Sequence, residues 1–143
     1  MTASRGRRLR RISASSPARL FQGKARCDRC HLGANLTDEG FHNTGVAWSE
    51  GRLQDLGRFV VSGVERESGA FKTPTLREVE RTAPYMHDGS LATLEEVVDF
   101  YDRGGNVNPY LDPILKPLNL SPVEKETLVA FLRALTGQIQ EGR

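Results

Sequence analysis

The sequence predicts an all-α fold built from a few short helices. Thr93 and Glu96 have the spacing of a capping box, in which two side chains satisfy the first free backbone N–H groups of a helix. Ser121 and Glu124 repeat this spacing, and Pro122 occupies the first helical position, where no N–H is needed. No segment resembles a strand of a β-sheet. The length of 143 residues fits one domain.

Two longer helices are predicted near the C-terminus, because their apolar residues follow the helical period. The last helix stops before Gly137, and its apolar stripe has the i, i+3, i+4, i+7 spacing: Leu128, Phe131, Leu132 and Leu135. The helix that opens at Thr93 ends at Gly104, and its apolar face comprises Leu94, Val97, Val98 and Tyr101.

Shorter helical segments are expected at 18–25 and 76–81. Ser16 can cap the first, and Pro17 suits its first turn. Pro84 ends the second. The region between residues 33 and 69 is rich in Gly, Asn, Asp and Ser, which predicts loops with short helical turns.

Composition limits the possible functions. The formal net charge is +2, which is too small to indicate binding to nucleic acid or to an anionic membrane surface. No apolar run approaches the length of a membrane span. Hydrophobic residues make up 38% of the chain, so a core is possible but small, and a buried apolar cofactor would help to stabilise it.

The two ends differ from the rest of the chain. Residues 1–17 contain five arginines and no apolar segment after them, which predicts a flexible basic tail rather than a clear secretory signal. The alternative is a remnant of an export signal. The folded domain is predicted to span residues 18–137, with a C-terminal tail at 138–143.

The two cysteines lie in the sequence C-x-x-C-H, formed by Cys27, Cys30 and His31. Two thiols three residues apart can reach the two vinyl groups of one porphyrin, and the next histidine can then bind the iron. This motif predicts one covalently attached c-type haem, with His31 as the proximal ligand. The all-α class then becomes a cytochrome c fold, in which short helices pack around that haem.

Two other interpretations of the motif stay open. A C-x-x-C pair can be a dithiol redox centre, although such a centre usually lies in a βαβ setting that is not predicted here. Alternatively, Cys27, Cys30, His31 and His42 together have the residue types of a structural zinc site.

Several ordered segments make the sequence resemble one known family. From about residue 20 to 137 it is similar to the C-terminal haem domain of the bacterial dihaem cytochrome c peroxidase and MauG-like family. The segments are 41–46 (FHNTGV), 71–77 (FKTPTLR), 82–90 (TAPYMHDGS), 93–96 (TLEE) and 128–136 (LVAFLRALT).

The resemblance implies a function in electron transfer. Members have two c-type haem domains: the N-terminal haem reacts with hydrogen peroxide, and the C-terminal haem passes electrons to it from a donor protein. This chain has one C-x-x-C-H and matches only the second domain, so the peroxide-reactive haem is not in it. The alternative is a stand-alone monohaem electron carrier.

The resemblance also implies a distal iron ligand. Ordinary members have a methionine on the helix after the Thr-Leu-Glu-Glu segment, and the MauG-like branch has a tyrosine there. This position is Tyr101, with Met86 and His87 as alternatives nearby in the sequence. A phenolate ligand favours ferric iron and higher oxidation states, whereas a thioether favours ferrous iron.

Further site residues are weaker candidates. The family's interdomain calcium ion would correspond to the backbone carbonyls of Thr82 and Pro84, although two carbonyls do not complete a calcium shell. Three cations are candidates to pair with haem propionates: Arg58, Lys72 and Arg77. Trp48 can pack on the porphyrin edge or fill the core.

Partners and location follow from the same resemblance. The expected partners are a second haem domain or subunit and a small electron-donor protein of the cytochrome or cupredoxin type, with hydrogen peroxide involved only indirectly. Because c-type haem is normally attached outside the cytoplasm, we expect the protein in the periplasm.

Overall fold

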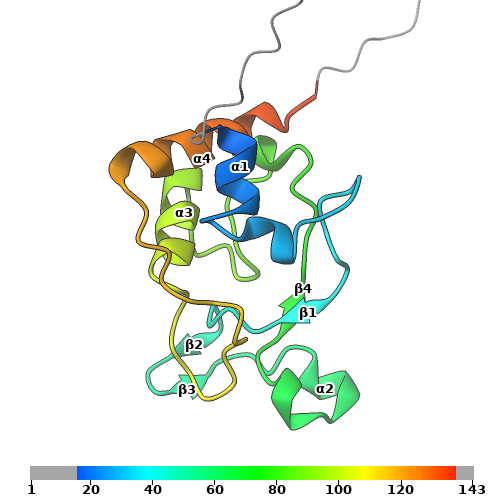
Figure 1. Cartoon of the computed structure of the whole chain (residues 1–143). Helices are drawn as coiled ribbons and strands as arrows, with labels where there is room; N and C mark the ends of the chain where they lie inside the picture. Colours follow the sequence, from blue (N-terminus) through cyan, green and yellow to red (C-terminus); the bar gives the residue numbers. More distant parts are fainter. Residues whose placement is uncertain (1–15, 138–143) are drawn as a thin grey trace, which may run out of the picture.

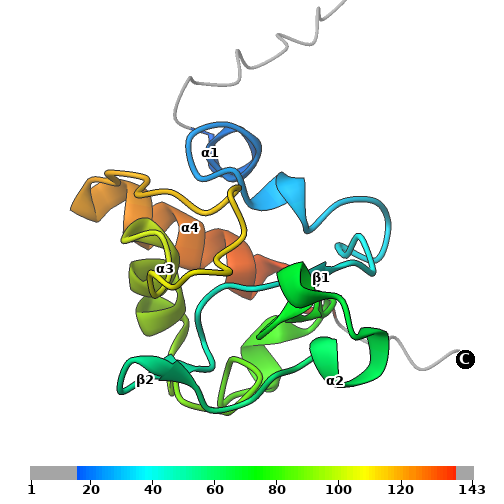
Figure 2. The same cartoon turned by 90° about the horizontal axis from the view of Figure 1, so that it is seen from below.

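Three helices lie together in one half of the molecule (Figure 1). They are α1 (Pro17–Gln22), α3 (Leu94–Asp102) and α4 (Pro122–Ala134). Helix α4 packs against both of the others, so that it lies between them (Figure 2). The structure is a computed structural model that describes residues 16–137, and the tails predicted at either end lie largely outside this range.

The helix starts confirm the capping predictions. The Ser16 side chain accepts a hydrogen bond from the Arg19 N–H at 3.3 Å, at the start of α1. Both capping boxes are complete: in α3 the Thr93 hydroxyl accepts from the Glu96 N–H, and the Glu96 carboxylate accepts from the Thr93 N–H. The same pair of bonds opens α4. Local sequence therefore fixes where these helices begin.

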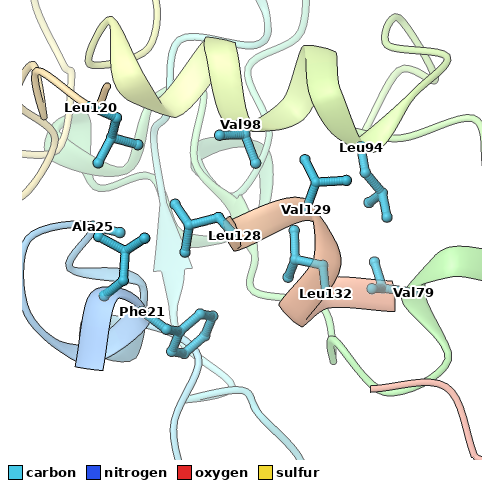
Figure 3. Close-up of a cluster of buried hydrophobic side chains, with 10 residues drawn as sticks. Phe21, Ala25, Val79, Leu94, Val98, Leu120, Leu128, Val129 and Leu132 are labelled. Atoms are coloured by element: carbon cyan, nitrogen blue, oxygen red, sulfur yellow. The ribbon is translucent and has the colours of Figure 1, made fainter. Parts of the chain in front are cut away.

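The hydrophobic core lies where these three helices meet (Figure 3). Phe21 of α1 packs against Phe131 of α4, with 5.0 Å between the ring centroids. Apart from these rings, aliphatic side chains fill the core. The buried cluster consists of Leu20, Phe21, Ala25, Val79, Leu94, Val98, Leu120, Leu128, Val129 and Leu132.

The other half of the molecule consists of loops, two small sheets and short helices (Figure 1). Strand β1 (Phe41–His42) pairs antiparallel with β4 (Phe71–Lys72), and β2 (Trp48–Ser49) pairs antiparallel with β3 (Arg52–Leu53). Helix α2 is the single turn Phe59–Ser62. Three 3₁₀ helices complete the described chain: η1 (Cys27–Arg29), η2 (Glu65–Glu67) and η3 (Val79–Arg81).

The prediction of an all-α cytochrome c fold is therefore wrong. The described residues contain four α-helices and two antiparallel sheets. Each strand is two residues long, too short for apolar–polar alternation to be visible in the sequence. The β1–β4 pairing also joins residues about thirty positions apart, so no local pattern specifies it. The helical turn expected at 76–81 forms only as η3.

A buried asparagine holds the loops of this half together. The Asn43 side chain donates to the Ser68 carbonyl at 2.7 Å and accepts from the Gly45 N–H at 2.8 Å. It also exchanges hydrogen bonds with the Asn108 amide. Gly105 lies so close to this segment that a Cβ there would come within 2.3 Å of the Thr44 carbonyl oxygen. The segment after α3 therefore packs directly on the segment after β1.

Asp102, the last residue of α3, connects that helix to the start of α4. One carboxylate oxygen accepts from the Leu120 N–H at 2.8 Å, and the other lies 2.8 Å from Lys125 Nζ. Burial raises the pKa of Asp102, but the Leu120 N–H and Lys125 outweigh it and hold the pKa below its usual value. Within residues 16–137, no helix is long and apolar enough to cross a membrane.

Replacement of a core leucine tests the packing of α4. Leu128 is 3% exposed, so Leu128→Ala removes buried methyl groups and leaves a cavity, with an expected loss of about 2–5 kcal/mol in the free energy of unfolding. Val123 on the same helix is 69% exposed, and Val123→Ala should change stability by less than about 0.5 kcal/mol. Denaturant unfolding measures both, and equal effects would contradict the packing described.

The Asp102 connection predicts a pH dependence. Because the folded-state pKa is lowered, the stability from the ionised carboxylate is complete above the unfolded-state pKa of about 3.9 and is lost as the pH falls through the folded-state value. Asp102→Asn should therefore cost about 1–3 kcal/mol at neutral pH and progressively less below pH of about 4. Asp99→Asn is the control, since Asp99 also contacts Lys125 but is mostly exposed. A deficit that does not shrink in acid would contradict this account.

Candidate haem attachment site

The C-x-x-C-H motif forms one tight turn directly after α1. The backbone N–H groups of Cys30 and His31 both donate to the Cys27 carbonyl, at 3.3 and 2.9 Å. Both cysteines are free thiols, and Cys27 also packs against the helical core. A single turn therefore presents two thiols and one imidazole, which is the donor set that covalent attachment of a c-type haem requires.

The thiols are not of the reactive, low-pKa kind. Burial, together with the charge of Asp28, raises the pKa of Cys27 to about 12. Burial and the carboxylates Asp38 and Asp112 raise that of Cys30 to about 11. Dithiol redox centres depend on a thiolate at neutral pH, which positive neighbours or a helix N-terminus normally stabilise. These surroundings stabilise the protonated thiols, so the geometry does not favour the dithiol interpretation.

The His31 ring is held in a defined orientation. Its Nδ1 lies 2.9 Å from the Leu36 carbonyl oxygen. A carbonyl only accepts hydrogen bonds, so this contact places the proton on Nδ1 and leaves the lone pair on Nε2. Burial lowers the pKa of His31, which keeps the ring neutral. A neutral histidine whose second nitrogen donates to a carbonyl is the usual form of a metal-binding histidine, so these residues fit a haem iron.

The loop that carries the Leu36 carbonyl is fastened by the segment after β4. The Thr75 hydroxyl donates to the Asn35 carbonyl at 2.5 Å, and Arg77 Nε donates to the Ala34 carbonyl at 2.6 Å. The Thr37 hydroxyl donates in the other direction, to the Thr73 carbonyl at 2.7 Å. Residues 73–77 thus act as a strap over the loop, and the strap fixes the group that orients His31.

Tyr101 of α3 lies near the two cysteines of the motif. Burial is the main cause that raises its pKa well above the usual value, and Cys30 and Cys27 would raise it further when ionised. Among the described residues its hydroxyl has no hydrogen-bond partner, and its ring meets Phe100 edge to face. The phenol is therefore near both thiols, although some seventy positions separate them in sequence.

The alternative distal ligands have other surroundings. His87 stacks on Phe71 with 3.7 Å between ring centroids, and its Nε2 lies 3.0 Å from Asp55. Asp55 and His87 line a shallow depression of about 230 Å³ together with Val46, Ala47, Ser49, Gln54 and Asp88. Met86 precedes His87 in the sequence, and its backbone φ of 72° lies in the left-handed region. The choice among Tyr101, Met86 and His87 stays a prediction.

The structure regroups the residues of the predicted zinc site. Among the described residues, His42 forms a tight group with Cys30 and Asp38, and the ligand atoms of these three residues all lie within 4.8 Å of one another. Asp38 and Asp112, which both bond to His42, were not predicted. Asp38 is four residues from His42 and could have been suspected. Nothing in the sequence connects Asp112, seventy positions away.

The weaker candidates are scattered. Thr82 and Pro84 are exposed, and the Ala83–Pro84 peptide bond is cis; a calcium site there stays a prediction. Two of the three cations contact the loop after the motif: Arg77 donates to the Ala34 carbonyl, and Lys72 Nζ lies 3.8 Å from the Glu39 carboxylate. The Arg58 guanidinium instead lies over the Phe41 ring at 4.4 Å. Trp48 is half-buried in β2.

The strap can be tested without the cofactor. Thr75→Val removes the bond to the Asn35 carbonyl, worth about 1 kcal/mol, so amide hydrogen exchange across 33–38 should accelerate about fivefold. Thr127→Val is the matched control, because its hydroxyl also donates to a backbone carbonyl, but within α4. Unchanged exchange in the loop after Thr75→Val would show that the strap does not hold it.

The chain is similar in sequence to known proteins. No family model matches the chain. It is 38% identical to the cytochrome-c peroxidase IdrP1 of Pseudomonas sp. (strain SCT) over 144 residues, which cover 82% of this chain and 38% of that protein. It is 42% identical over 119 residues to the methylamine utilization protein MauG of Methylorubrum extorquens, covering 83% of this chain and 33% of MauG.

Solved structures give the same result. A MauG-like protein associated with microbial copper homeostasis superposes with a TM-score of 0.75 at 34% identity, over 85% of this chain and 46% of that one. The dihaem peroxidase BthA of Burkholderia thailandensis shares the fold, with a TM-score of 0.70 at 24% identity. The chain spans about a third of the length of the curated relatives that it matches. It belongs, over that part, to the family of the bacterial dihaem cytochrome c peroxidases and MauG.

Proposed function

We propose that this chain carries one c-type haem on Cys27 and Cys30, with His31 as the proximal iron ligand, and that it serves as an electron-transfer domain. The observation that carries the proposal is the His31 ring, whose Nδ1 is bonded to the Leu36 carbonyl beside two free thiols. This arrangement leaves Nε2 available to a metal on the same turn that offers the two thioether positions. A bound haem c would supply an iron centre that exchanges single electrons.

The chain's own residues have separate tasks in this proposal. Cys27 and Cys30 fix the position of the cofactor relative to α1 and the helical core. The Leu36 carbonyl keeps the proton on Nδ1 of His31 and keeps the ring from rotating. The strap at 73–77 prevents that loop from moving. Each task depends on contacts that exist in the protein alone.

We place Tyr101 as the distal ligand. Its hydroxyl has no partner among residues 16–137, and its side chain is near enough to Cys27 and Cys30 for either thiol, when ionised, to raise its pKa. The phenol is neutral in these surroundings, and the positive charge of a metal would favour its ionised form. Met86 is the alternative. His87 is less suitable, because Asp55 already pairs with its Nε2.

The partners belong to the proposal as well. The chain corresponds to only about a third of its relatives' length, which supports a second haem domain, in the same or another chain, as the electron acceptor. A small cytochrome or cupredoxin would deliver the electrons, and hydrogen peroxide would react only at the second haem. We expect the protein in the periplasm, where haem c is attached. We expect a calcium ion at Thr82 and Pro84 only where another domain supplies the remaining ligands.

Optical spectra of the haem-loaded chain test the proposal. The protein would be produced in a periplasm with haem-attachment machinery, together with Tyr101→Phe and the control Tyr85→Phe, whose phenol lies near the surface. We expect a c-type spectrum with one haem per chain. Tyr101→Phe should change the ferric ligand signature from low spin toward high spin, because the sixth ligand is lost, whereas Tyr85→Phe should not.

Each other outcome has a definite meaning. A spectrum unchanged in Tyr101→Phe removes Tyr101 as the ligand and directs the same test to Met86→Leu. A protein without haem, despite intact machinery, refutes the attachment site itself. A haem-loaded chain that exchanges electrons with a donor but never with a second haem protein would favour the stand-alone monohaem carrier.

A further inference from the structure

A polar cluster lies at the motif and shares one residue, Cys30, with it. It consists of Cys30, Asp38 and His42, with one possible ligand atom from each, and these atoms lie within 4.8 Å of one another. The three residues come from the motif turn, the loop after it and β1. A thiol, a carboxylate and an imidazole are the donor types that bind zinc and other divalent transition metals.

His42 is held between two carboxylates. Its Nδ1 lies 2.6 Å from Asp112 Oδ2, and its Nε2 lies 2.7 Å from Asp38 Oδ2. A neutral imidazole has a single N–H, so it can donate to only one of these carboxylates, and the other contact needs a further proton or a cation. His42 and the two carboxylates can therefore accommodate one positive charge, which is either a second proton on the ring or a bound cation.

Both carboxylates are also fixed by the backbone. Asp38 Oδ1 accepts from the Gly40 N–H at 2.8 Å, and Asp112 Oδ1 accepts from the Ile114 N–H at 2.9 Å. In each residue the second oxygen is thereby directed at His42. A site whose donors are already oriented loses little freedom when a metal binds.

The distance between the His42 and Asp38 donors needs only a small adjustment. Zinc bonds of about 2.0–2.2 Å to nitrogen and oxygen place neighbouring tetrahedral donors about 3.3 Å apart. The Nε2 of His42 and the Oδ2 of Asp38 would therefore separate by about half an ångström. Asp112 on Nδ1 completes the carboxylate–histidine–metal arrangement that holds most metal-binding histidines.

We propose that the chain, before haem is attached, binds one divalent transition metal such as Zn²⁺ through Cys30 Sγ, an Asp38 oxygen and His42 Nε2. Asp112 orients His42, and a water completes the tetrahedral shell. When the metal binds, the Cys30 thiol releases its proton to solvent, and so does the Nε2 of His42, which donates to Asp38 in the metal-free chain. The side chains of His42 and Asp38 are about one-fifth exposed, so an ion and its water can enter.

This site and the haem compete for one sulfur atom. A thioether at Cys30 removes the thiolate, which is the strongest of the three ligands for zinc. Metal bound at Cys30 would in turn leave only Cys27 free for attachment. The two states are therefore mutually exclusive, and the metal site belongs to the haem-free chain.

Cobalt titration of the reduced, haem-free full chain tests the proposal. Co²⁺ in a zinc site with a thiolate ligand gives a sulfur-to-metal charge-transfer absorption, and we expect it to saturate at one equivalent and to be displaced by Zn²⁺. Cys30→Ser should abolish the absorption, and His42→Gln should abolish tight binding. Asp112→Asn should weaken binding about 10- to 100-fold, because the His42 ring loses its orienting partner.

Matched variants separate this site from the zinc site predicted on the sequence. Cys27→Ser keeps Cys30, and His87→Gln removes a histidine outside the cluster, so both should bind Co²⁺ as the wild type does. Far-UV circular dichroism checks that each variant folds. If His42→Gln does not fold, Asp38→Asn provides a second test of a ligand. Loss of binding in Cys27→Ser, or no charge-transfer absorption in the wild type, would overturn the proposal.

The result is independent of haem attachment. Cobalt binding in a chain that never acquires haem would support the metal site while refuting the proposed electron-transfer function. A haem-loaded protein whose haem-free form ignores Co²⁺ would refute the metal site alone.

Discussion

The packing of α4 against α1 and α3 is the contact on which the rest of the structure depends. Phe21 packs against Phe131 in this contact, and Ala25, in the segment between α1 and the motif, belongs to the same buried cluster. Cys27 follows two residues later and packs on the same core. The motif is therefore anchored to the helical core through Cys27, and not by its loop alone.

The second constraint is the pairing of β1 with β4, which serves two sites at once. On the β4 side the chain continues into the strap, residues 73–77, which fastens the loop that orients His31. On the β1 side it places His42 between Asp38 and Asp112. Two residue pairs of antiparallel sheet thus align His31 and the neighbouring polar cluster, although a sheet this small has little stability of its own.

The surroundings of the motif favour protonated thiols. Burial is the main cause, and the carboxylates of Asp28 near Cys27 and of Asp38 and Asp112 near Cys30 add to it. Such surroundings are unsuited to dithiol redox chemistry but suited to a cation or to a covalently attached, iron-bearing cofactor. The chain matches about a third of the length of relatives that are cytochrome c peroxidases and MauG proteins. This similarity favours the haem cofactor over the dithiol centre.

The sequence by itself determined the features that depend on neighbouring residues. The capping pairs at Thr93 and Ser121 located the starts of α3 and α4. The spacing of Cys27, Cys30 and His31 identified the C-x-x-C-H motif, on which the proposed haem attachment rests. These signals are local, because a cap or a turn needs only three or four residues. Only the tertiary structure decided the sheets, the strap and the position of Asp112, since each joins residues that are tens of positions apart and have no common pattern.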